Sequence, residues 1–502
     1  MRLSKSLYTR GLQCTKSLWL KKYNSKVLSK PDKSAQSVFE TGDKVGTLAC
    51  QLFPNGKKIP FEGTTFEEKI ELTKKLMEEG VENIYEATFE YNGVLVMVDI
   101  LHINVDDSVE IYEVKSSTWG PKKTIKDLKT YIDDASIQFY VLNGLGLEIK
   151  KCSITLLNNQ YIFKDTIEVE KLFTSIDVLN EVKELQEDIP TRLEIFSTVL
   201  SDEKNEYKVD IGAQCKKPYL CDAYDYCWRT QQNIPEYSVF NIFNIGKKPI
   251  SLYKEGIIEI KDIPDESITT ENQRLAVDAW LHKAKFVDKE SIENFINDMK
   301  YPIYHLDFET YTDAIPSFNN QRSYQQMCFQ YSLHVEQEDG SIIHKEFLGK
   351  EGTDPREEFI KHMISDIKGN STVLVYSESF EKTRIKELAE DFPQYFNELL
   401  NINENILDLG IPFKEKWYYD YRLKGKWSIK LVMPLLAPHM ADAYKKLQLV
   451  QNGGDAMNTF PKLIEMDDNT RAEYKQALLK YCELDTLSMV EILKTLKNIG
   501  MN

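Results

Sequence analysis

Long apolar segments are missing from the 502-residue sequence. No run approaches the ~20 apolar residues that a membrane-spanning helix needs, so we expect neither a membrane segment nor a membrane partner. The N-terminal stretch "MRLSKSLYTRGLQCTK" also lacks the apolar core of a secretory signal peptide. Because this stretch is basic, contains Ser and has no acid, a transit peptide is the alternative to the cytoplasmic location that we expect.

The sequence also has few cysteines, and its basic residues are outnumbered by its acidic ones. Eight cysteines in 502 residues are too few for a disulfide scaffold, which favours a reducing cytoplasm. A net charge of −16 would by itself disfavour nucleic acid as a partner. The charge is uneven, however, because residues 1–30 carry eight Lys or Arg and the first acid is Asp32. This basic run is either a solvated face or part of a path for nucleic acid.

The chain is nevertheless long enough for two or three domains. Its apolar content of 42% and charged content of 28% are those of an ordinary globular protein. Residues 1–232 alternate helical and strand patterns, and residues 301–502 contain strands followed by helices. Residues 233–300 between them indicate a connecting module of short strands and a helix capped at Thr269 or Thr270. The order of elements predicts an α/β multidomain protein.

A first candidate site lies at the junction of two predicted strands. Segment 94–101, "VLVMVDIL", contains Asp99, and the next strand, within "VEIYEVKSST", contains Glu113 and Lys115. Side chains two positions apart share a face of a strand, so Glu113 and Lys115 point the same way as Ile111. Two clustered carboxylates need a cation between them, and Mg²⁺ or Mn²⁺ suits such hard oxygen ligands. The alternative is an exposed cross-strand ion pair.

The pattern D-x13-E-x-K resembles the core of PD-(D/E)XK nucleases, and specifically their RecB-like branch. The resemblance implies a restriction-endonuclease-like fold in which Asp99 and Glu113 bind metal and Lys115 stabilises charge on a phosphate. It further implies that Glu86, in "YEATFEY", is an additional metal-binding acid. Gln138, in the amphipathic helix that follows the strands, matches the Gln of the family's Q-x3-Y motif.

Two features of that branch are absent. The residue four positions after Gln138 is Leu142 rather than Tyr, and the helix near "FETGDKVGTLA" carries no histidine where the branch has an early metal ligand. These departures leave open the alternative that this site is inactive.

Four cysteines bracket the same region: Cys14 precedes it, and Cys215, Cys221 and Cys227 follow it with five residues between neighbours. Four thiolates is the ligand count of a [4Fe–4S] cluster or of an all-cysteine zinc site, and unmetallated cysteines are a third alternative. The arrangement resembles the iron–sulfur subfamily of RecB-like nucleases, in which the first two cysteines of the triplet commonly have two residues between them. The resemblance implies a [4Fe–4S] cluster that joins the N-terminal segment to the end of the domain. We expect the other cysteines to occupy core positions: Cys50, Cys152, Cys328 and Cys482.

A second set of acids occurs in the C-terminal third. "YHLDFETY" is an apolar strand with Asp307 and Glu309 on one face, and Glu381 in "VLVYSESFEK" follows another strand. In "YCELDT" the spacing places Tyr481 and Asp485 on one face of a helix. Four acids from three segments need cations to cluster, and two Mg²⁺ or Mn²⁺ ions could clamp a phosphodiester. The alternative is a strand with two solvated acids.

These motifs resemble the DnaQ-like, RNase H-fold 3′–5′ exonucleases of the DEDDy type. The resemblance implies that Asp307, Glu309, Glu381 and Asp485 bind two metal ions and that Tyr481 orients the attacking water. The second acid of that family is normally Asp, whereas this chain has Glu381. A further acid, Asp408 in "ILDLGIPF", is not assigned as a ligand.

The segment "FKEKWYYDYRLKGKWSIK", residues 413–430, interleaves aromatic and basic side chains. It carries six Lys or Arg against two acids. Aromatics that stack among cations are typical of a groove for single-stranded nucleic acid. The alternative is an aromatic cluster that packs within its own domain.

The whole order of domains resembles a bacterial family in which an iron–sulfur RecB-like nuclease is fused to a DnaQ-like exonuclease. The resemblance implies a metal-dependent DNA nuclease with two active sites that acts on single-stranded DNA ends in repair or in defence against foreign DNA. One alternative is an RNA-processing 3′–5′ exoribonuclease, and another is a nucleic-acid-binding scaffold with one inactive site. The sequence names no protein partner.

Overall fold

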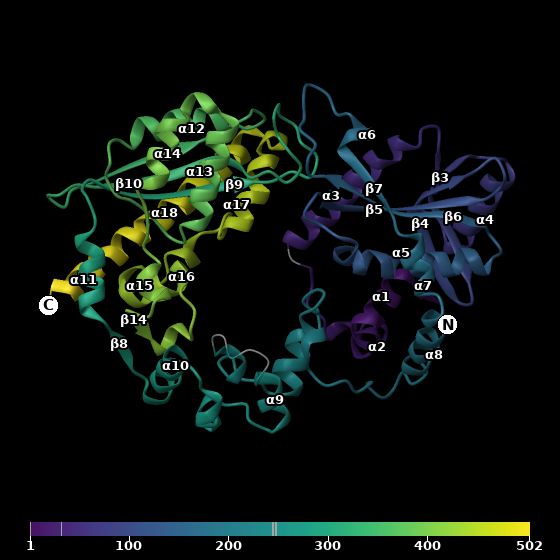
Figure 1. Cartoon of the computed structure of the whole chain (residues 1–502), viewed down its shortest axis with the longest axis horizontal. Coiled ribbons are helices and arrows are strands. Elements are labelled where there is room, and N and C mark those ends of the chain that lie inside the picture. Colours follow the sequence, from purple (N-terminus) through teal and green to yellow (C-terminus); the bar gives the residue numbers. More distant parts are fainter. Residues whose placement is uncertain (1, 32, 243–244, 246–247, 502) are drawn as a thin grey trace. The chain divides into compact units, whose positions relative to one another are not determined.

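The structure is a computed structural model that describes residues 2–31, 33–242, 245 and 248–501. Figure 1 shows the chain, which divides into two compact units. The first comprises Met1–Asn233 with Asp313–Tyr324, and the second comprises Ile234–Thr312 with Gln325–Asn502. Each unit combines helices with a mixed sheet, which confirms the prediction of an α/β multidomain protein. In the described part of the chain no helix is long and apolar enough to cross a membrane.

The two-unit division can be compared with the three regions predicted from sequence. The first boundary between the two units follows Asn233, next to the predicted domain boundary at 232. The predicted connecting module, residues 233–300, belongs to the second unit except for Asn233. The segment Asp313–Tyr324, which follows β9 in the chain, belongs to the first unit. This return of the chain has no local sequence pattern that could have predicted it.

The sheet of the first unit has the strand order β2-β3-β4-β5-β6-β7, with β1 pairing β4. β5 and β6 run parallel, as do β1 and β4, while β3, β4 and β5 are antiparallel neighbours. The predicted strands at 94–101 and around Glu113 are confirmed as β4 and β5. The strands are β1 Leu3–Ser4, β2 Lys57–Lys58, β3 Asn83–Tyr91, β4 Val94–Ile103, β5 Val109–Trp119, β6 Ile149–Asn158 and β7 Phe173–Asp177.

Helices cover both faces of this sheet. α1, α4, α5, α7 and α8 contribute to the core on one face, while α3 and α6 contribute to the core on the other. The predicted amphipathic helix is α5. Its residues Ile132, Ala135 and Phe139 are buried as the spacing required, and so is Leu128, which directly precedes it. The helices are α1 Lys5–Gln13, α2 Thr15–Tyr23, α3 Lys33–Ala49, α4 Phe66–Glu78, α5 Lys129–Gly144, α6 Val169–Leu172, α7 Leu179–Glu184 and α8 Asp188–Val199.

The main sheet of the second unit has the order β11-β10-β9-β12-β13, and β14 pairs with β8 in a small ribbon. β9 is antiparallel to β10 and parallel to β12. Alternation along β9 sends Tyr304, Leu306 and Phe308 into one core and leaves Asp307 and Glu309 on the opposite face, as predicted. The strands are β8 Lys285–Val287, β9 Ile303–Tyr311, β10 Met327–Glu336, β11 Ile342–Leu348, β12 Val373–Val375, β13 Ile406–Asp408 and β14 Tyr418–Asp420.

The helices of the second unit also lie on both faces of its sheet. α12, α13 and α14 pack against one face, and the long α18 packs against β9 and β10 on the other (Figure 1). The helices are α9 Lys248–Lys254, α10 Glu271–His282, α11 Lys289–Asn297, α12 Arg356–Asp366, α13 Ser379–Asp391, α14 Phe396–Glu404, α15 Ile411–Lys414, α16 Ile429–Leu436, α17 Gly453–Thr459 and α18 Asp468–Met501.

One local prediction for residues 233–300 is wrong and another is confirmed. The pieces expected as short strands near 250–268 are α9 and single 3₁₀ turns, because their apolar residues pack as turns into a local core. The predicted cap is correct: Thr270 precedes α10, and its side chain accepts a hydrogen bond from the Gln273 N–H.

Candidate active sites

The first candidate site forms where β4 and β5 separate. Their pairing extends from Ile103↔Val109 to Ile100↔Tyr112 and goes no further. The next residue of each strand is Asp99 or Glu113, and Oδ2 of Asp99 accepts a 2.7 Å hydrogen bond from the Val114 N–H. The carboxylate thus satisfies a backbone donor that the strand ladder has released.

Three acids lie in one row across neighbouring strands. The register pairs Tyr85↔Ile100 and Ala87↔Val98 put Glu86 opposite Asp99, and Asp99 and Glu113 each stand one residue beyond the last pair of β4 with β5, Ile100↔Tyr112. Glu86 departs from regular strand geometry with a φ of 60°. Burial raises the pKa of Glu86, and burial followed by the charge of Glu113 raises the pKa of Asp99 to about 7. The structure therefore brings the three predicted acids of this site together.

Glu113 is almost fully buried, and its carboxylate is surrounded by donors. Lys5 and Lys115 both donate to Oε1 at 2.7 Å, and Gln138 Nε2 donates to Oε2 at 2.6 Å. Burial opposes ionisation here, but the two lysines outweigh it and hold the pKa of Glu113 below its usual range. The exposed ion pair offered as an alternative is thereby excluded, because Glu113 is 1% exposed.

Lys5 and Asp134 belong to this cluster, although sequence reasoning did not assign them. Lys5 is the first residue of α1, which follows β1 directly, and β1 pairs with β4 just beyond the point where β4 leaves β5. Lys115 donates to Asp134 Oδ2 at 2.7 Å. The acid-free run at residues 1–30 hinted at Lys5, while nothing in the pattern of α5 distinguished Asp134.

The three acids of this first site are less well arranged to bind a cation than their number suggests. Among the described residues, no three oxygens of these acids lie within 4.8 Å of one another. Both carboxylate oxygens of Glu113 accept hydrogen bonds from ammonium or amide donors. Oδ1 of Asp99, in contrast, accepts no hydrogen bond from the described residues. Of this pair, Asp99 therefore has the oxygen that remains available to a cation, and the charge of Lys115 acts on Asp99.

The four predicted cysteines converge in the first unit. Cys14 is the residue between α1 and α2, and Cys227 lies in a π-helical turn, Tyr226–Gln231. The thiol of Cys14 lies close enough to those of Cys215 and Cys221 to raise its pKa, after the larger effect of burial. Burial, and then charges that include the other three thiols, raises the pKa of Cys227 to about 11. All four are free thiols.

Polar contacts fix this convergence. Arg10 makes a bidentate ion pair with Asp222, at 2.8 and 2.9 Å, and Cys221 Sγ lies 3.5 Å from the Ser17 hydroxyl. In the described part of the chain no three of the sulfurs lie within 4.8 Å of one another. Cys152, Cys328 and Cys482 are buried as expected, while Cys50 is only half-buried.

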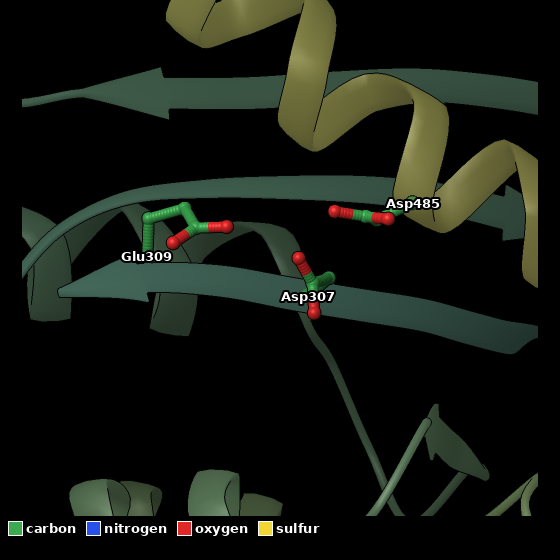
Figure 2. A group of neighbouring side chains, drawn as sticks. All are labelled: Asp307, Glu309 and Asp485. Carbon is green, nitrogen blue, oxygen red and sulfur yellow. The ribbon is translucent and has the colours of Figure 1, made fainter. Parts of the chain in front are cut away.

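The second candidate site brings acids of β9 and α18 together, as Figure 2 shows. One carboxylate oxygen each of Asp307, Glu309 and Asp485 lies within 4.8 Å of the other two. Gly453, the first residue of α17, lies beside Glu309, since a Cβ there would lie 3.4 Å from Oε2, an ordinary contact distance. Of the described residues, this is the group whose geometry could hold a metal ion.

Burial and mutual repulsion raise the pKa values of the acids at this second site. Burial, and then the charge of Asp485, raises the pKa of Glu309 to about 8 and that of Asp307 well above its usual value. Burial also raises the pKa of Asp485 itself. Since neighbouring carboxylates cannot all ionise without compensation, the donor set and its repulsion fit a divalent cation.

Three side chains around the triad were missed by sequence reasoning. The Tyr444 hydroxyl donates to Asp485 Oδ1 at 2.5 Å, and Cys482 Sγ lies 3.7 Å from Asp307 Oδ2. Lys430, in α16, donates to the Tyr481 hydroxyl at 3.4 Å. Its ammonium lies 4.9 Å from the centre of the Tyr481 ring and lowers the pKa values of Glu309 and Asp485. Tyr481 also interacts with Asp485 on the same helical face, as the spacing required.

Glu381 lies at the edge of this site rather than within the triad. It is 3% exposed at the start of α13, and its Oε2 has no hydrogen-bond partner among the described residues. Burial raises its pKa to about 8, and its charge acts on Asp307 and Glu309. Asp408 instead accepts hydrogen bonds from the Ser377 and Gly410 N–H groups, so it supports the backbone.

The aromatic and basic segment 413–430 packs mainly within its own unit. Tyr418 and Tyr419 are buried, and Trp417 and Trp427 pack against the core that includes α16 and α18. Lys416 lies over the rings of Tyr419 and Trp427. These contacts favour the alternative of a local aromatic cluster, although the last residue of the segment, Lys430, reaches the acid site.

A family model and two uncharacterized proteins are similar to parts of this chain. A family model for a domain of unknown function, DUF2779, matches residues 304–428, which span β9 to the small ribbon. An uncharacterized protein, UU173, of Ureaplasma parvum is 24% identical over 360 residues, which are 66% of this chain and 51% of that protein. Another, MG366 of Mycoplasma genitalium, is 25% identical over 244 residues, 44% of this chain and 36% of its own length. The chain thus spans about half or less of these two relatives.

Proposed function

We propose that this protein is a metal-dependent nuclease with two active sites that degrades DNA from single-stranded ends. In this proposal the first unit has a PD-(D/E)XK, RecB-like fold and the second a DnaQ-like, RNase H-type fold. The observation that carries the proposal is the convergence of three acids from two elements, half-buried Asp307 and Glu309 and buried Asp485, whose oxygens approach within 4.8 Å. Such a cluster is stable with all acids ionised only when a cation binds it.

At the second site, Asp307, Glu309 and Asp485 would hold Mg²⁺ or Mn²⁺, with Glu381 at the edge as a further ligand. The bound ions would supply Lewis acidity at the phosphodiester. Tyr481, whose hydroxyl interacts with Asp485, would orient the attacking water. Lys430 is positioned to balance negative charge near the same hydroxyl, which makes it the cation most suited to stabilise a phosphate there.

At the first site, Asp99 and Glu113 would bind Mg²⁺ or Mn²⁺, with Glu86 next in the row. Lys115 would stabilise negative charge on the phosphate, and its contact with Asp134 fixes its direction. Gln138 holds the second oxygen of Glu113 in place. Lys5 supplies a second positive charge that allows Glu113 to remain ionised while buried.

The four convergent thiols would bind a [4Fe–4S] cluster, with zinc as the alternative. What supports a shared site is the convergence of the four thiols, since Cys14, Cys215 and Cys221 all act on the pKa of Cys227. Four thiolates is the ligand count of either metal centre. The chain itself contributes the ion pair of Arg10 and Asp222, which ties α1 to the cysteine-bearing segment.

Digestion of matched DNA and RNA oligonucleotides tests this function. Single-stranded and duplex forms, labelled at the 5′ or the 3′ end, are incubated with Mn²⁺ or with EDTA. We expect Mn²⁺-dependent shortening of single-stranded DNA. Preferred digestion of RNA would show that the substrate is RNA and not DNA. Binding without digestion of either would show that the protein is a nucleic-acid-binding scaffold.

A further inference from the structure

A cavity of about 950 Å³ in the first unit joins the acid site to the cysteine cluster. Its lining includes Lys115 at one end and Cys221 with Asp222 at the other, and α1, the start of α5 and the loop at 217–222 form its walls. A pocket of this size takes roughly two nucleotides, given that pockets of about 300–1,000 Å³ hold ligands of drug size. It lies outside the row of acids that the proposed chemistry uses.

The charge of the lining suits a single strand with phosphates. Each acid of the lining already has a basic partner in the same lining: Asp222 pairs with Arg10, Asp134 with Lys115, and Asp133 with Lys129. Two further cations line the cavity: Arg192, which pairs with Asp188 outside the lining at 3.0 Å, and Lys217. After these pairs cancel, the positive charge of Lys217 remains, which favours an anionic ligand.

The loop between Cys215 and Cys221 presents aromatic and apolar surface at this cavity. Tyr219 is 60% exposed and Leu220 is 70% exposed, and both belong to the lining. The backbone beneath them is fixed, because Gln13 Nε2 donates to the carbonyls of Gln214 and Tyr219 at 2.8 Å each. The Cys221 N–H also donates to the Cys215 carbonyl at 3.0 Å. An exposed aromatic ring on a fixed loop is a stacking platform for a base.

We propose that this cavity binds the end of a single DNA strand, with one base stacked on Tyr219 and the backbone directed to Lys115. The proposal rests on the proposed function and adds its substrate path. The five residues between Cys215 and Cys221 make the platform, so whatever the cysteines bind sets the position of Tyr219. A duplex cannot place a single base against the ring without unpairing it, which makes the site selective for single strands.

Photocrosslinking of the full chain tests this path. A Glu113→Gln, Asp307→Asn double variant, which should leave DNA intact, is irradiated with oligo-dT that carries one 5-iododeoxyuridine at successive positions from its end. Mass spectrometry should identify Tyr219 as the crosslinked residue when the label is within a few nucleotides of the end. Crosslinks that reach only residues outside the cavity lining would overturn the path.

Matched variants give a second measurement. In the Asp307→Asn background, Tyr219→Ala should weaken single-strand binding and Glu113-dependent cleavage about 10-fold, as loss of one base stack predicts, and Tyr219→Phe should stay within about twofold. Tyr207→Ala is the control, since Tyr207 is 38% exposed and not in the lining. Cleavage that persists unchanged in Tyr219→Ala rejects the path and keeps the nuclease, whereas absence of any Glu113-dependent cleavage rejects both.

Discussion

The ammonium of Lys5, at the start of α1, donates a 2.7 Å hydrogen bond to Oε1 of Glu113 on β5, across 108 positions of the chain. Lys115 donates to the same oxygen. Because Glu113 is 1% exposed, these two cations decide whether it is charged. The N-terminal segment is therefore part of the first site.

Loss of Lys5 should destabilise the fold through Glu113. Lys5→Met removes one partner of a buried charge, and we expect a loss of about 2–3 kcal/mol in the free energy of unfolding, measured by urea denaturation. Lys5→Met with Glu113→Gln should cost less than the sum of the single variants, because the unpaired charge is gone. Lys21→Met, at an exposed position of α2, is the control. Additive costs in the double variant would show that the two side chains are not coupled.

Lys430 should act in the second site and not in the first. Lys430→Met should lower the turnover of Asp307-dependent cleavage about 10²-fold, because a fixed positive charge beside Tyr481 is lost. Lys430→Arg should recover part of that rate. Lys445→Met is the matched control, since Lys445 is 79% exposed and pairs with Asp442. An equal effect of Lys430→Met and Lys445→Met on turnover would count against this role.

Metal-free protein should lose stability as the pH rises. The folded pKa values of Glu309 and Glu381 are about 8, above the usual 4.5, so the folded state keeps protons that the unfolded chain releases. The stability that these two groups contribute is therefore fully present below about pH 4.5 and is lost as the pH rises through 8. We expect Tm in EDTA to fall by roughly 5–10 °C between pH 5 and pH 9.

Divalent cations and one variant separate this effect from general titration. Mn²⁺ should abolish most of the fall in Tm, because it binds the ionised acids of the folded state. Glu381→Gln should reduce the fall in EDTA, whereas Glu398→Gln, at an exposed position of α14, should not. A Tm that is the same with EDTA and with Mn²⁺ at pH 9 would mean that the acids bind no metal.

The cysteine cluster predicts a coloured protein. Anaerobically purified protein should be brown, with about four irons per chain. A Ser substitution at any one of Cys14, Cys215, Cys221 or Cys227 should remove most of the visible absorbance. Cys50→Ser should keep it, because the Cys50 thiol donates instead to the Gly46 carbonyl. Colourless protein with one bound zinc would establish the alternative metal.

Sequence reasoning reached the residues whose signals are local. Alternation along β5 and β9 oriented Glu113, Lys115, Asp307 and Glu309, and helical spacing paired Tyr481 with Asp485, because strand and helix periods fix the faces. It missed Lys5, Lys430 and Tyr444, which reach their sites through tertiary packing of separate helices and turns. It left segment 413–430 open between a groove and a packed aromatic cluster, since a stacked surface and a packed cluster have the same composition.

The most direct test of the account is whether two active sites can be switched off separately. Full-length wild-type, Glu113→Gln, Asp307→Asn and double-variant proteins are compared on end-labelled single-stranded DNA with Mn²⁺, with folding checked by circular dichroism. We predict that each single variant loses one of two distinguishable product patterns and that the double variant digests nothing. Undiminished digestion by the double variant would contradict the assignment of both sites.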